Sequence, residues 1–226
     1  MSALEAIEAQ VVQCRRCPRL VEWRERVARE KRAAFAGQEY WGRPVPGFGD
    51  PRGRLVVVGL APAAHGANRT GRIFTGDRSG DFLYGALHRA GYASQPHAHA
   101  RGDGLRLTDC FIVAPVKCAP PANQPLPAER DNCAPWLHAE LGALEQARVL
   151  LCLGAFGWTA ALRARAALGD PPPRPRPRFG HAAEAPGERL TLVGSYHVSQ
   201  QNTFTGRLTP AMFDAVLDRA RRLTVG

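Results

Sequence analysis

The chain has 226 residues, 45% of them hydrophobic, and a formal net charge of +10. This length suits one domain with a full core, and no apolar run approaches the ~20 residues that a membrane-spanning helix needs, which excludes such a span. A charge excess this large favours a polyanionic partner, above all nucleic acid. A coding bias explains why nearly all the basic residues are Arg, but it does not explain the excess itself.

The N-terminal segment, about residues 1–35, is predicted to form two helices joined by a cysteine knuckle. Its first ten residues, MSALEAIEAQ, are acidic and helical in pattern, unlike a signal peptide, so we expect a cytoplasmic protein. Cys14 and Cys17 follow as C-x-x-C, a spacing that presents two thiolates to one metal ion or cluster. A second helix is expected from about Pro18 to Lys31.

The stretch from Leu55 to Asp77, LVVVGLAPAAHGANRTGRIFTGD, joins a strand to a long polar loop. Its first four residues are apolar and mostly β-branched, which is typical of a parallel strand buried on both faces. Ligands of open α/β sheets bind at such strand ends. The order Gly-Leu-Ala-Pro excludes a dinucleotide or Walker fingerprint. An ordinary connecting loop is the alternative, but such a loop would not need so many polar side chains.

Strands and helices alternate along the rest of the chain. We expect helices over about 79–90, from Pro127, over 156–167 and over 210–223, and strands over about 108–113, 148–153 and 190–194. This alternation predicts an α/β fold, a three-layer α/β/α sandwich with a central four-stranded parallel sheet. No internal repeat or boundary divides the chain, so residues 1–226 are expected to form one domain, with the cysteine-bearing N-terminal segment packed onto it.

Residues 169–180, GDPPPRPRPRFG, form a segment of low complexity that consists mainly of Pro and Arg. Such a segment cannot contribute to a core and should be extended and solvated. It is either a spacer or an arm that contacts a nucleic-acid backbone, and the sequence does not decide between the two.

Six cysteines divide into two groups by their surroundings. Cys110 and Cys152 lie in apolar, strand-like runs and are expected to act as small buried hydrophobes. The other four lie in polar or proline-containing contexts and are Cys14, Cys17, Cys118 and Cys133. Zinc and a [4Fe–4S] cluster both accept four thiolates, and the spacing alone does not separate them.

Three motifs and the four cysteines are distributed over nearly the whole chain. The motifs are the loop G-L-A-P-x-x-H-G-x-N-R-T-G-x-x-F-T-G-D at 59–77, the segment C-A-P-P-A-N at 118–123, and H-V-S-x-x-N-x-x-T-G-R-L-T at 197–209. The chain resembles the family 5 (type B) uracil-DNA glycosylases of the uracil-DNA glycosylase superfamily in these motifs and in its cysteines. The resemblance implies a [4Fe–4S] cluster on the four cysteines, with zinc as the alternative.

The same resemblance implies a monofunctional glycosylase of base excision repair. Such an enzyme would excise uracil and other deaminated bases from double-stranded DNA, by flipping the nucleotide out and hydrolysing its N-glycosidic bond. We expect it to act as a monomer.

The resemblance also implies the roles of individual residues. His197 would stabilise the departing base, Asp77 would activate water or stabilise the sugar cation, and Asn123 would bind the base or sugar. Further groups are expected to bind the substrate base, namely Gly59, Leu60, Ala61, His65, Phe74 and Ala114. Contacts with DNA, in the minor groove or at phosphates, are expected from Arg69, Ser199, Gln200, Asn202, Thr205 and Arg207.

Ala114 departs from the related families, which place an Asn there to read the edge of uracil. A site without that amide should discriminate weakly, so we expect activity on hypoxanthine and on xanthine as well as on uracil. The alternative function is a non-catalytic iron–sulfur or zinc nucleic-acid-binding module. Such a module would not require Asp77, His197 and Asn123 on converging loops, and release of a free base would separate the two functions.

Overall fold

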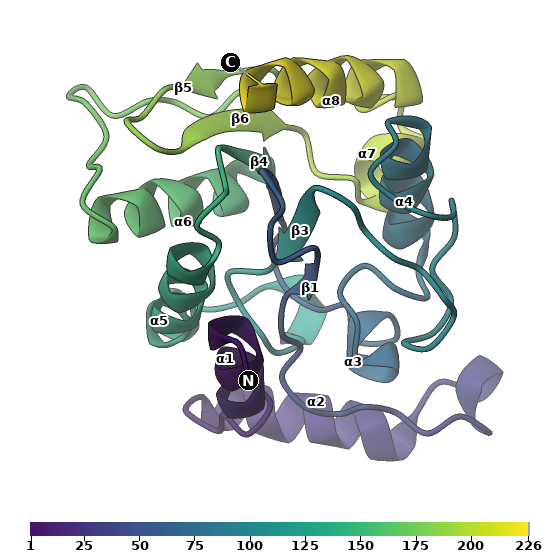
Figure 1. The fold of residues 1–226 in the computed structure, drawn as a ribbon. Coiled ribbons are helices and arrows are strands. Elements are labelled where there is room, and N and C mark those ends of the chain that lie inside the picture. The colour runs from purple at the N-terminus through teal and green to yellow at the C-terminus, as the bar shows by residue number, and fades with distance from the viewer. Residues whose placement is uncertain (226) are drawn as a thin grey trace.

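The computed structural model describes residues 1–225 and contains one six-stranded sheet with the order β1-β3-β2-β4-β6-β5 (Figure 1). The four inner strands are parallel: β3 (Cys110–Val113), β2 (Leu55–Val58), β4 (Val149–Leu153) and β6 (Thr191–Ser195). Two strands of two residues each, β1 (Phe48–Gly49) and β5 (Glu184–Ala185), pair antiparallel at the edges. The sheet therefore has six strands and is mixed: the four predicted parallel strands form its centre, and the two antiparallel edge strands were not predicted. Strands of two residues carry no periodicity that a sequence pattern could reveal.

Helices cover both faces of the sheet. Leu55 and Val57 of β2 pack into a core formed with α4 (Arg78–Arg89) and α8 (Pro210–Val225). Val56 and Val58 point the other way, into a core formed with α5 (Pro127–Ala143) and α6 (Gly154–Ala167). Every residue of β2, β3 and β4 is buried, as expected where helices cover both faces of a parallel sheet.

The N-terminal helices lie along the lower edge of the view in Figure 1. Helix α1 (Ala3–Val11) begins with a capping box, in which the Ser2 hydroxyl accepts from the Glu5 N–H while the Glu5 carboxylate accepts from the Ser2 N–H. It packs against α5, whereas α2 (Pro18–Glu30) contacts α3 (Ala67–Thr70) of the long loop after β2. The N-terminal segment thereby touches both the helical layer and the loop that follows the central strand.

Four short helical elements were not expected from the sequence: α3, α7 (Gln200–Phe204) and the 3₁₀ helices η1 (Ala33–Phe35) and η2 (Pro121–Asn123). Each has three to five residues, too few for an amphipathic period to show. Within residues 1–225, no helix is long and apolar enough to cross a membrane.

Candidate active site

Three loops and the N-terminus of α6 follow the carboxyl ends of the four parallel strands and meet at one edge of the sheet. The loop after β2 contacts the loop after β3, where the Val116 N–H donates to the Leu60 carbonyl at 3.2 Å. The loop after β6 approaches the end of β4, because a Cβ on Gly154 would lie 3.4 Å from the Cβ of His197. This is the edge at which open α/β sheets bind their ligands.

Phe74 and His197 form the centre of this edge. Their ring centroids are 6.2 Å apart with a 38° tilt. The Phe74 ring lies against Gly59, where a Cβ would come within 3.0 Å of two of its ring carbons. Phe74 has a φ of +51°, a left-handed conformation that costs a bulky residue roughly 1–3 kcal/mol and persists only where the surroundings enforce it. The start of α4 supplies that support, since Gly80 packs directly onto the Phe74 carbonyl.

His197 is partly buried, and the loss of solvent around its ring lowers its pKa to about 4. The imidazole is therefore neutral near pH 7. The Asn202 amide donates to the His197 carbonyl at 2.8 Å and so fixes the backbone that carries the ring. Within residues 1–225, no hydrogen bond occupies either ring nitrogen of His197, so the ring is free to donate to a ligand.

Asp77 is the N-cap of α4, three residues after Phe74. Its Oδ1 accepts from the Gly80 N–H at 3.0 Å, and its Oδ2 lies over Gly66, where a Cβ would be only 2.0 Å away. Burial raises the pKa of Asp77, and the N–H groups of Gly80 and Ser79 oppose that rise. The carboxylate thus has a helix-capping function in addition to whatever chemistry it performs.

Comparison with known proteins identifies the family. A family model described as the uracil DNA glycosylase superfamily matches residues 46–221, the segment that contains the sheet and the loops at this edge. The chain belongs to the uracil-DNA glycosylase superfamily. It is accordingly a DNA glycosylase, an enzyme of the hydrolase class.

Relatives named Type-5 uracil-DNA glycosylase match most of the chain. The relative from Mycobacterium tuberculosis is 56% identical over 219 residues, which cover 96% of this chain and 80% of the relative. The relative from Thermus thermophilus is 51% identical over 221 residues, or 97% of each chain. The relative from Pyrobaculum aerophilum is 43% identical over 210 residues, or 93% of this chain and 88% of its own.

Several polar side chains of the glycosylase loop hold the loop together instead of facing a ligand. The Arg69 guanidinium donates to the His65 carbonyl (2.8 Å), the Gln38 amide oxygen (2.6 Å) and the Gly76 carbonyl (2.9 Å). Arg69 is only 8% exposed, and its guanidinium carbon lies 4.0 Å from the centroid of the Phe35 ring. Three of the five guanidinium N–H groups of Arg69 thus bond inside the protein, and its contact with a DNA phosphate stays a prediction.

His65 and Arg72 are held in the same way. The Nδ1 of His65 lies 3.0 Å from the Tyr40 hydroxyl, and burial, followed by the nearby Arg32 and Arg69, lowers the pKa of His65. Arg72 is 3% exposed and pairs with Asp103 at 2.7 Å. Burial of Asp103 would raise its pKa, but the hydrogen bonds from Arg72 and from backbone N–H groups outweigh this and lower it. The loop is therefore a rigid support for the Phe74 ring.

The loop after β3 contributes less than the sequence suggested. Ala114 is 2% exposed and belongs to the same core as Phe74. Asn123 is exposed, with a φ of +56°, and no hydrogen bond within residues 1–225 holds its side chain. The structure thus brings Phe74, His197 and Gly59 together and leaves Asn123 on the surface of its loop. The backbone N–H groups of Leu60 and Ala61 have no acceptor in the described part of the chain.

Helix α7 and its flanks present the residues predicted to bind DNA. Gln200, Thr205 and Arg207 are exposed, and Ser199 is partly so. The Thr205 hydroxyl donates to the Gln201 carbonyl at 2.6 Å. Asn202 differs from this group, because its amide is engaged by the His197 carbonyl. This hydrogen bond gives Asn202 a positioning role, and its contact with DNA stays a prediction.

Two aromatic residues of this glycosylase segment were missed by the sequence reasoning. Phe204, at the end of α7, is 67% exposed, and its ring lies 5.6 Å from the guanidinium of Arg78. Tyr196 stacks on His181 with 4.9 Å between ring centroids, and the guanidinium carbon of Arg207 lies 4.7 Å from the centroid of the Tyr196 ring. The sequence feature that could have identified them is an aromatic residue within an otherwise polar run.

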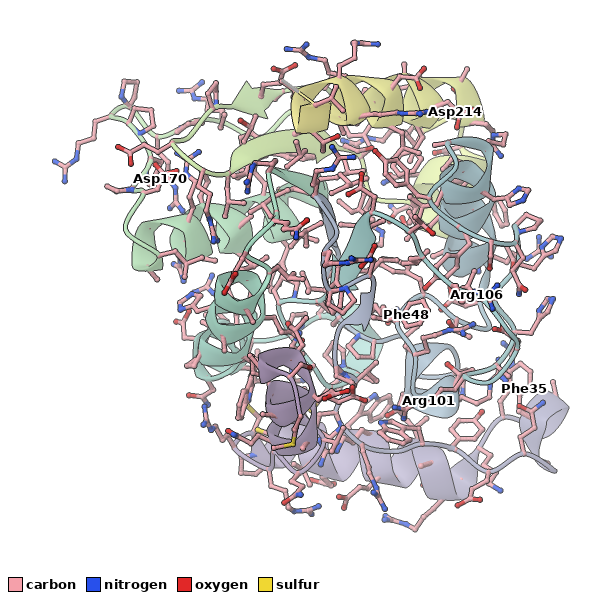
Figure 2. The ribbon with its side chains drawn as sticks, viewed as in Figure 1. Phe35, Phe48, Arg101, Arg106, Asp170 and Asp214 are labelled. Carbon is pink, nitrogen blue, oxygen red and sulfur yellow. The ribbon has the colours of Figure 1, made fainter. Side chains whose placement is uncertain are left out.

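All six cysteines are free thiols, and four of them gather where α2, the loop after β3 and α5 meet (Figure 2 shows sulfur atoms beside α1 and α2). The Arg24 guanidinium donates to the Cys118 sulfur at 2.9 Å, the Lys117 N–H to the Cys133 sulfur at 3.3 Å, and the Asn132 amide to the Cys17 sulfur at 3.6 Å. Burial raises the pKa of Cys118 to about 11 and that of Cys133 to about 12. The other two, Cys110 and Cys152, are fully buried in strands, as predicted.

The arrangement of these thiols bears on what they could hold. No three His, Cys, Asp or Glu side chains among residues 1–225 converge tightly enough to hold a single metal ion. In a zinc site all four ligands bind one atom. In a [4Fe–4S] cluster each cysteine binds a different iron atom, so the sulfurs stand further apart. N–H donors around the sulfurs are also what tunes and stabilises such clusters.

Proposed function

We propose that this glycosylase excises uracil, and also hypoxanthine and xanthine, from double-stranded DNA in base excision repair. The glycosidic bond is inaccessible inside a duplex, so the damaged nucleotide must leave the base stack and enter the site at the sheet edge. One observation carries the proposal: a neutral, partly buried His197 faces the ring of Phe74 at the joined strand ends.

The reaction requires a stacking surface for the base and a stabilised negative charge on it. Phe74 provides the stacking surface, and its strained backbone keeps it above Gly59. As the bond breaks, its electron pair leaves with the base, and the neutral His197 ring donates a hydrogen bond to the base oxygen that gains charge. The unpaired N–H groups of Leu60 and Ala61 are suited to hold the same base.

On the sugar side, a water oxygen adds to C1′ of the deoxyribose, and a proton of that water must be removed. Asp77 is the carboxylate nearest in sequence to the stacking ring, and it either accepts this proton or stabilises the cationic sugar by its charge. Asn123 would approach the base or sugar only when DNA is bound, because its side chain is otherwise unattached. Phe204 is the exposed aromatic side chain suited to fill the space left by the extruded nucleotide.

Broad specificity follows from Ala114. Its methyl group offers no donor or acceptor to the base edge, and it is buried in the core next to Phe74. A site that hydrogen-bonds a base edge rejects analogues strongly, whereas an apolar site rejects them by only ~10–200-fold. Uracil and hypoxanthine should therefore both be accepted.

Cys14, Cys17, Cys118 and Cys133 would hold a [4Fe–4S] cluster, with zinc as the alternative, and the N–H donors to the sulfurs of Cys118 and Cys133 suit such a cluster. Its chemistry, when bound, would be structural: it would cross-link the N-terminal helices to the loop after β3. Cys118 packs with Ala61 in one small cluster of side chains, so that link would also support the turn beneath the base.

The test is excision from matched duplexes that contain uracil or hypoxanthine, followed by alkali and strand sizing under single-turnover conditions. We expect breaks at both lesions. His197→Ala should slow excision by ~100-fold or more, the effect typical of removing one donor to developing charge. Breaks at uracil alone would contradict the specificity argument, and DNA binding without any breaks would favour a non-catalytic binding module.

Asp77 needs a variant that separates its two functions. Asp77→Asn keeps an excellent N-cap acceptor for the Gly80 N–H but removes the charge. If the charge takes part in the reaction, this variant should fold normally and lose ~100-fold or more in rate. If Asp77 only caps α4, Asp77→Asn will retain its activity, while Asp77→Ala will lose about 1 kcal/mol of stability.

A further inference from the structure

The Pro/Arg arm, residues 171–180, is fixed along the side of α6 near the active-site edge. The Trp158 indole N–H donates to the Pro177 carbonyl at 3.1 Å, and the Arg176 guanidinium donates to the Thr159 carbonyl at 3.4 Å. Trp158 also meets Phe179 edge-on, with centroids 6.2 Å apart. Trp158 and Thr159 lie in the first turns of α6, which begins at the carboxyl end of β4. These contacts give the arm a defined course instead of leaving it a loose spacer.

The C-terminal end of the arm is held directly beside the site. The Gly180 carbonyl packs onto Gly194 near the end of β6, where a Cβ would lie 2.3 Å from it. The next residue, His181, stacks on Tyr196, and its Nδ1 accepts from the Tyr196 N–H at 3.3 Å. Tyr196 is the chain neighbour of His197. The distance from the arm to the base-binding pair is therefore set by well-defined contacts.

The arm carries three positive charges that the protein does not neutralise. Arg174, Arg176 and Arg178 are all exposed, and none forms an ion pair with a carboxylate within residues 1–225. The alternating prolines favour an extended backbone without internal hydrogen bonds, so little order has to be gained on binding. A guanidinium presents a planar set of donors that matches phosphate oxygens.

We propose that the Pro/Arg arm binds the phosphate backbone of duplex DNA to one side of the extruded nucleotide. This inference rests on the proposed function. Arg178 lies three residues from His181 and Arg174 seven residues, which at no more than ~3.3–3.6 Å per residue places them within about 10 and 25 Å of His181. With ~3.4 Å of duplex per base pair, the arm contacts phosphates within about seven base pairs of the lesion. Arg178 contacts the nearest phosphate and Arg174 the most distant.

The test compares two triple variants with equal net charge. The arm variant is Arg174→Gln, Arg176→Gln and Arg178→Gln. The control variant is Arg52→Gln, Arg106→Gln and Arg222→Gln, three exposed arginines that lie before β2, before β3 and near the end of α8. Figure 2 shows Asp170, where the arm begins, and Arg106 on opposite sides of the molecule. Both variants change only exposed side chains, so both should keep the melting temperature of the wild type.

The first measurement is fluorescence anisotropy with a uracil-containing duplex at several salt concentrations. Each lost phosphate contact should reduce the slope of log K against log salt by about 0.9, so the arm variant should lose about 2 to 3 in slope. The control variant should lose less than about 1. Excision at saturating enzyme should remain that of the wild type in both, because neither triple touches the site.

The second measurement uses duplexes with only three base pairs on one side of the uracil and at least ten on the other. The weaker DNA binding of the arm variant relative to the wild type should vanish when one particular flank of the duplex is shortened. It should persist when the other flank is shortened. Equal defects in the two triple variants, or a defect independent of both flanks, would overturn the proposal. Wild-type protein without any excision would instead refute the proposed function, so the two failures are distinguishable.

Discussion

Acid should destabilise this protein through His197. The pKa of this histidine falls from its ordinary value of 6.5 to about 4 because the ring is desolvated in the folded chain. Between these two values the unfolded chain binds a proton at His197 and the folded chain does not, so folding stability decreases as pH falls from 6.5 to 4. At about 1.4 kcal/mol per pKa unit the loss is at most about 3.5 kcal/mol, and the residual solvent exposure of the side chain reduces it further.

Urea unfolding of wild type and His197→Asn at pH 7, 5.5 and 4.5 measures this contribution. The difference between the two proteins isolates His197, because the other histidines are common to both. Between pH 7 and pH 4.5, the free energy of unfolding of the wild type should fall by about 1–3 kcal/mol more than that of His197→Asn. Histidine ring signals in NMR spectra, assigned by their loss in the variant, should show His197 still neutral at pH 5.5. A midpoint near 6.5 and a difference that does not change with pH would refute the reasoning.

Three further outcomes follow from the same geometry. Gly59→Ala places a methyl group 3.0 Å from carbons of the Phe74 ring, closer than the ~3.5–4.0 Å optimal separation of two carbon atoms, so the excision rate should fall at least ~10-fold. The control variant Gly37→Ala should have no effect, because nothing lies within 4 Å of the added methyl group. Asn202→Ala removes the hydrogen bond to the His197 carbonyl and should lower the single-turnover excision rate about tenfold, whereas the equivalent change at exposed Gln201 should not. Arg24→Met should lower bound iron and the associated visible absorbance, and Arg24→Lys should partly restore both; unchanged iron content would rule out its role at the thiols.

The sequence was sufficient to predict the main framework and the family. The four parallel strands are runs of buried apolar residues, and the long helices repeat apolar residues at helical spacing. Both signals are local, so they can be read before any tertiary contact is known. The motifs at 59–77 and 197–209 also indicated which strand ends carry the site, because the carboxyl ends of parallel strands always meet at one edge.

The sequence could not decide which polar residues of these motifs face a ligand. Arg69 and Asn202 are of residue types that often contact DNA. In the folded chain, however, the Arg69 guanidinium donates to Gln38 and Gly76, and the Asn202 amide donates to His197. Phe204 is of a residue type that usually lies in a core, yet its side chain is exposed. A side chain's role depends on the acceptors and the burial that other segments supply, and a local pattern does not contain that information.

The same limit applies to the Pro/Arg arm and to the outer strands. Composition alone predicted that the arm would be extended and solvated. Its place beside the site depends on contacts with Trp158, which precedes the arm in the chain, and with Gly194 and Tyr196, which follow it. Strands β1 and β5 exist only because β3 and β6 offer them backbone partners. The sequence thus determined the secondary-structure elements and the family, because local periodicity and motifs carry that information. Long-range hydrogen bonds and packing decided where each functional group lies, because they depend on the whole folded chain.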